Sequence, residues 1–80
     1  MTPNIHHDHD RKWLKEQLSK LPRSVALEIC GKYSAYYKKA YDDEPVSHRK
    51  ESKARVEANT RLREFVKKYN EWESSNARQS

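Results

Sequence analysis

Residues 54–72 read ARVEANTRLREFVKKYNEW, and this stretch decides the fold class. Its apolar side chains recur at steps of three and four residues, at Ala54, Ala58, Leu62, Phe65, Tyr69 and Trp72. Such steps place side chains on one face of an α-helix, at a spacing close to the heptad that paired helices use. We therefore predict a long third helix whose apolar seam packs against a second helix.

The charged residues around this seam have a helical spacing as well. Acid and base stand four residues apart, in the favourable order, in the pairs Glu51 with Arg55, Glu57 with Arg61, and Glu64 with Lys68. Pairs of this kind stabilise the exposed side of a helix. We expect all three to form on the outer face.

Two shorter helices are predicted before this one. The first runs to about Lys20, is capped by Asp8 or Asp10, and has an apolar stripe of Trp13, Leu14, Leu18 and Leu21. Pro22 suits the first turn of the next helix, so Leu21-Pro22 is the predicted corner. The second helix runs from Arg23 to about Tyr41, and its apolar face comprises Val25, Ala26, Ile29, Cys30, Tyr33, Tyr37 and Ala40.

These helices predict an all-α fold, either a small three-helix bundle or a long helical hairpin with a shorter N-terminal helix. The chain has one glycine and three prolines, too few to form the turns that would connect the short strands of a sheet. We expect a flexible N-terminal arm over residues 1–9, a single helical domain over 10–73, and a frayed polar tail over 74–80.

Composition limits the classes of partner. A chain of 80 residues buries only about 60% of its unfolded surface, and here charged residues (36%) outnumber hydrophobic ones (34%). Stability can therefore depend on a partner, and a homodimer stays open. The net charge of +5 favours acidic partners, either DNA or an anionic protein surface. A single cysteine, Cys30, and the lack of a long apolar run indicate a cytoplasmic protein with no membrane partner.

The sequence offers no constellation that predicts catalysis, so we expect no enzyme, no catalytic residues and no cofactor. The densest group of metal-type ligands is at the N-terminus and comprises His6, His7, Asp8, His9 and Asp10. Adjacent ligands on a flexible end lack a scaffold that fixes their geometry. We therefore expect no metal site there and interpret the group as a solvated arm.

Three aromatic residues are the predicted contacts with a protein partner: Tyr36, Tyr41 and Trp72. The alternative is direct DNA binding by the cations near the second corner, which are Lys32, Lys38, Lys39, Arg49, Lys50 and Lys53. This alternative includes a helix-turn-helix over residues 26–41, whose turn would contain Gly31.

Parts of the chain resemble helical segments of temperate bacteriophage replication proteins of the gene A type. The similarity comprises Leu21-Pro22, Val25, Ile29, Tyr33 and Tyr37, then Glu57-Ala58-Asn59 with Leu62-Arg63-Glu64. Replication proteins of this type are nickases whose nucleophiles lie in a Tyr-x-x-x-Tyr-Lys pattern, and Tyr33, Tyr37 and Lys38 reproduce this spacing. Such nickases also need a sheet with a histidine metal motif, and this sequence has neither, so we do not expect nickase activity. The resemblance implies a phage or prophage accessory protein. From the missing catalytic pieces, the small core and the exposed aromatic residues, we expect it to be noncatalytic, and to bind and modulate or inhibit a DNA-processing or regulatory protein.

Overall fold

A computed structural model describes the backbone of residues 2–79 and the side chains of residues 2–74. It contains three helices, α1 (Arg11–Ser19), α2 (Arg23–Asp43) and α3 (Lys50–Gln79), and two short 3-10 turns, η1 (Asp8–Asp10) and η2 (Ser47–Arg49). No strand occurs among residues 2–79. The prediction of an all-α fold with three helices is confirmed.

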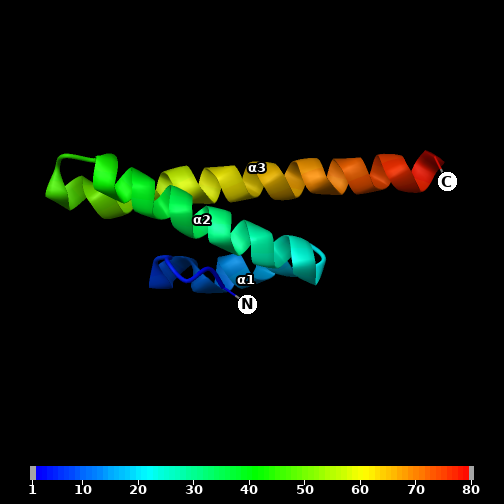
Figure 1. Cartoon of the computed structure of the whole chain (residues 1–80), viewed down its shortest axis with the longest axis horizontal. Helices are drawn as coiled ribbons and strands as arrows, with labels where there is room; N and C mark the ends of the chain where they lie inside the picture. Colours follow the sequence, from blue (N-terminus) through cyan, green and yellow to red (C-terminus); the bar gives the residue numbers. More distant parts are fainter. Residues whose placement is uncertain (1, 80) are drawn as a thin grey trace.

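The helices form an elongated molecule of 51 × 19 × 17 Å (Figure 1). Helices α2 and α3 run antiparallel from the corner that joins them, and α1 lies beside the first part of α2. The C-terminal end of α3 projects beyond the other two helices. Helix α3 continues to Gln79, well past the expected end of the helical domain at residue 73, and Ser80 lies outside the described residues.

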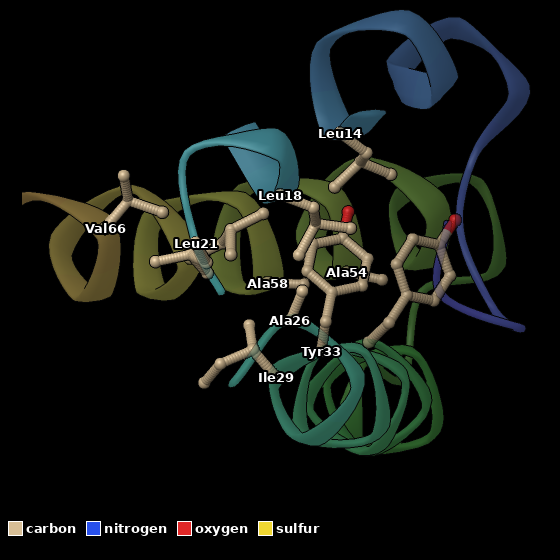
Figure 2. Close-up of a cluster of buried hydrophobic side chains, with 11 residues drawn as sticks. Leu14, Leu18, Leu21, Ala26, Ile29, Tyr33, Ala54, Ala58 and Val66 are labelled. Atoms are coloured by element: carbon tan, nitrogen blue, oxygen red, sulfur yellow. The ribbon is translucent and has the colours of Figure 1, made fainter. Parts of the chain in front are cut away.

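The core lies where the three helices meet (Figure 2). Leu14 and Leu18 of α1 point toward the ring of Tyr33, which extends from α2. Helix α3 contributes a row of four buried side chains at steps of four residues, namely Ala54, Ala58, Leu62 and Val66. The alanines are small, so the other helices can approach α3 closely at this point.

This buried row differs from the predicted seam of α3. Val66 is buried, whereas Phe65 and Tyr69 are only partly buried and Trp72 is 57% exposed. A row at steps of four drifts around the helix, because 3.6 residues make one turn. The neighbouring helices cross α3 along this drifting row and leave the aromatic side chains at its edge.

The corner between α1 and α2 is formed as predicted. Pro22 has φ −57° and precedes α2, and its carbonyl accepts the first helical bond, from the N–H of Ala26, at 2.9 Å. The missing N–H of a proline costs nothing at this end of a helix. Leu21 is buried beside the corner and joins α1 to the core.

Helix α2 continues through Gly31 without a turn. The expectation of a helix-turn-helix over residues 26–41 is therefore wrong, because it needs a break at this glycine. A Cβ atom added to Gly31 would meet no heavy atom within 4 Å. Within the chain, close helix packing is thus not the reason for a glycine here.

The N-terminal segment, expected as a flexible arm, lies against both long helices. Pro3 is fully buried, and the N–H of Ile5 donates to the hydroxyl of Ser34 in α2 at 3.1 Å. The Nε2 atom of His7 contacts the carboxylate of Glu51 at the start of α3. These contacts lead the chain into η1 and α1, and they position Asp10.

Candidate binding site between α2 and α3

A groove of about 220 Å³ opens between α2 and α3, and we call it the α2–α3 groove. Its apolar lining includes Ile29, Ala58, Leu62 and Phe65. Its polar lining includes Lys32 and Tyr36 from α2, and Arg61, Glu64 and Lys68 from α3. Helical spacing explains both sets, because residues three or four apart share one side of a helix.

The guanidinium of Arg61 is held in place in this groove by contacts with two side chains. Its Nε donates to Glu57 Oε1 at 2.8 Å, one turn earlier on α3, as the charge spacing predicted. Its guanidinium lies 4.4 Å from the centre of the Tyr36 ring, a cation–π contact that joins α3 to α2. The hydrogen bond to Glu57 raises the pKa of Arg61, so this side chain stays charged.

A second hollow continues from the first toward the corner of α2 and α3, and we call it the corner groove. Tyr36 and Arg61 line both. The corner groove also contains Lys39 and Lys53, together with the carboxylates Asp43, Glu44 and Glu57. Its three cations are therefore balanced by three acids, whereas the α2–α3 groove has three cations and one acid, Glu64.

The three aromatic residues predicted to contact a partner are all exposed, but the structure does not bring them together. Tyr36 lines the two grooves, while Tyr41 lies at the corner beside Lys50, whose Nζ is 5.4 Å from its ring centre. Trp72 lies on the projecting end of α3, roughly 33 Å along the helix axis from Lys50. Only Tyr36 belongs to a groove.

The six cations of the DNA hypothesis are also divided among several places. Lys32 lines the α2–α3 groove, 3.7 Å from Glu28. The Nζ of Lys50 donates to the carbonyls of Tyr41 and Glu44, so it stabilises the corner. Lys38 and Arg49 are exposed, and Lys39 and Lys53 lie among the acids of the corner groove.

A row of aromatic rings follows α3 from the α2–α3 groove toward its end. The ring centres of Phe65 and Tyr69 are 6.2 Å apart, and those of Tyr69 and Trp72 are 5.9 Å apart. The hydroxyl of Tyr69 donates to Glu73 at 2.9 Å. The row continues the apolar lining of the groove toward the C-terminal end of α3.

A polar network ties the N-terminal turn to α2 and α3. The carboxylate of Asp10 accepts two bonds from Arg55, at 2.9 and 3.0 Å, and one from the amide of Asn59, at 3.0 Å. The hydroxyl of Tyr33 donates to the amide oxygen of Asn59. The network holds together residues of three elements that are far apart in sequence.

The charges of this network shift its pKa values. The bonds from Arg55 lower the pKa of Asp10, although burial acts in the opposite direction. Burial raises the pKa of Tyr33. The expected capping of α1 by Asp10 is not realised, because its side chain makes no capping bond.

The network was not predicted from the sequence. Spacing on α3 paired Arg55 with Glu51, but in the fold Glu51 pairs with His7. Asp10 lies 45 residues from Arg55 and 49 from Asn59. No local pattern relates residues so far apart.

The residues that suggested other chemistry are not arranged as a site. Tyr33 and Tyr37, which match the nickase spacing, are 2% and 8% exposed. Burial raises the pKa of Cys30, so its thiol is held in the unreactive form. Across the described part of the chain, no three histidine, cysteine or acidic side chains are grouped so that they could hold a metal ion.

Comparison of the chain with family models, with curated proteins and with solved structures finds no match. Among residues 2–79 no helix combines the length and the apolar character that crossing a membrane requires.

Proposed function

We propose that this chain is a noncatalytic accessory protein that binds another protein in the α2–α3 groove. One observation carries the proposal: the groove has an apolar floor that includes Phe65, beside the exposed ring of Tyr36 and the stacked guanidinium of Arg61. Protein interfaces have an apolar centre with a polar rim, and tyrosine and arginine are common among their strongest contacts.

The noncatalytic part of the proposal is supported by the places of the reactive side chains. Tyr33 and Tyr37 are buried, and the hydroxyl of Tyr33 is occupied by Asn59. Burial raises the pKa of both tyrosines and of Cys30. A nucleophile needs the opposite, namely an accessible group with a lowered pKa or an adjacent base.

Protein is the favoured partner over DNA because of the charges in the corner groove. Lys39 and Lys53 share this groove with Asp43, Glu44 and Glu57, whose carboxylates would repel a phosphate backbone. The resemblance to phage replication proteins makes a DNA-processing protein the first partner to test. Under this proposal the accessory protein would act by occupying a surface of that partner.

Photo-crosslinking from the groove tests the proposal. A benzophenone amino acid at position 36 lies in the groove, and the same group at position 35 is exposed on α2 outside both grooves, so Ala35 gives a matched control. We expect position 36, and not position 35, to form an adduct with a single protein in extracts of the source cells, identified by mass spectrometry. Equal adducts from both positions, or none from position 36, would contradict the proposal.

The DNA alternative has its own measurement. Binding of a labelled duplex through several phosphates weakens steeply as salt rises. We expect no such binding at moderate salt. Tight binding that falls with salt, and that is lost in Lys38→Gln and Lys39→Gln variants, would favour the DNA alternative.

A further inference from the structure

Arg61 lies at the junction of the two grooves and is held there from two sides. Glu57 binds its Nε at 2.8 Å, and the ring of Tyr36 lies 4.4 Å from its guanidinium. Among the described side chains, Arg61 donates a hydrogen bond through Nε alone. A guanidinium that is fixed through Nε and one face keeps its terminal N–H groups for an incoming acceptor, and their fork matches a carboxylate.

The two grooves differ in charge on either side of Arg61. Toward the projecting end of α3, Lys32 and Lys68 share the groove with one lining acid, Glu64, and Lys32 also lies 3.7 Å from Glu28, an exposed residue outside the lining. Toward the corner, the cations are balanced by acids. A negatively charged ligand is therefore attracted to the open end of the α2–α3 groove and not to the corner.

We infer that the groove selects an acidic protein segment, with Arg61 receiving one of its carboxylates and Lys32 and Lys68 attracting the others. This inference rests on the proposed function and names the chemistry of its partner. Apolar side chains of the segment would pack on the apolar floor beside these cations. The segment is therefore an amphipathic helix with acidic residues along one edge. The residues of α3 that line the α2–α3 groove, from Ala58 to Lys68, span roughly 15 Å, which a helical segment of about 15 residues covers in full.

A pair of synthetic helical peptides tests the inference with the full chain. One peptide of about 15 residues combines leucine and alanine with glutamates along one edge, and the other has glutamine in place of every glutamate. Binding is measured by fluorescence anisotropy, and the Arg61 Nε–H signal is followed by NMR. We expect the glutamate peptide to bind at least about tenfold more tightly and to shift the Arg61 signal, because charge-assisted bonds are about twice as strong as neutral ones.

Variants of the protein locate the effect. Arg61→Gln should weaken binding of the glutamate peptide about tenfold, and Arg61→Lys should weaken it less, because lysine keeps the charge but loses the fork. Lys68→Gln should weaken it severalfold. Lys67→Gln removes the same charge from a neighbouring exposed residue that does not line the groove, and should change binding less than twofold. Circular dichroism checks that each variant is folded.

The possible failures are distinguishable. Equal binding of both peptides would overturn the acidic preference and leave binding in the groove standing. If Lys67→Gln and Lys68→Gln weakened binding of the glutamate peptide equally, the net charge of the protein would explain the binding. That result would overturn the role of the groove. No binding of either peptide, with crosslinks still formed from position 36, would overturn the inference but not the proposed function. A short DNA duplex is tested as a competitor of the glutamate peptide in the same assay. If the duplex bound as tightly as this peptide and also depended on Arg61, the inference of an acidic protein segment would be overturned.

Discussion

Asp10→Ala is the substitution that tests the packing of the N-terminal segment most directly. Asp10 accepts two bonds from Arg55 and one from Asn59, and its side chain is only 13% exposed. The variant removes all three bonds at once. It also leaves the guanidinium of Arg55 and the amide of Asn59 without this acceptor, so the segment loses its main polar contact with α3.

The size of the loss follows from these contacts. A hydrogen bond to a charged group contributes about 1.5–3 kcal/mol, but the three bonds share one carboxylate and are not additive. The side chain of Arg55 is 36% exposed, so water partly replaces its lost partner. We expect the free energy of unfolding to fall by about 2–3 kcal/mol. For a chain of this length the total free energy of unfolding is only about 4–12 kcal/mol.

Urea unfolding followed by circular dichroism measures this loss at pH 7. Asp8→Ala is the matched control, because Asp8 belongs to the same turn η1 and is exposed. We expect the control to change stability by less than about 0.5 kcal/mol. Equal effects of the two variants, or a loss below about 0.5 kcal/mol for Asp10→Ala, would refute the reasoning.

The pH dependence gives a second check of the same contact. The pKa of Asp10 is lower in the folded chain than its ordinary value of 3.8. The stability that comes from its charge is therefore fully present above that value and is lost as the pH falls through the folded pKa. The difference between the natural chain and Asp10→Ala should thus be constant near neutral pH and shrink below about pH 4.

Three further substitutions test the helices. Gly31→Ala should stabilise the chain by about 1 kcal/mol, because the added methyl group meets no atom within 4 Å and alanine is the better helix former; a lower urea midpoint would contradict this. Ala58→Leu should destabilise by about 1–3 kcal/mol or more, since Ala58 is 0% exposed in the core, and an unchanged midpoint would show that the site has room. Tyr33→Phe should cost about 1 kcal/mol through the lost bond to Asn59, a loss that should vanish in an Asn59→Ala background.

The sequence by itself determined the helices and the first corner. Periodic apolar residues, few glycines and Pro22 at the start of α2 act over one or two turns, so they predict structure locally. The same reasoning found the pair of Glu57 and Arg61, because both residues belong to one helix. It also found that Tyr36 is exposed.

Only the tertiary structure decided which side chains meet across the helices. Arg55 binds Asp10 and not Glu51, and Val66 is buried in place of Phe65. Lys32 and Lys68 line one groove only because α2 and α3 pack side by side. These contacts are set by the angles at which the helices cross. The angles depend on how the buried side chains of all three helices pack together, and the spacing of residues within one helix does not contain that information.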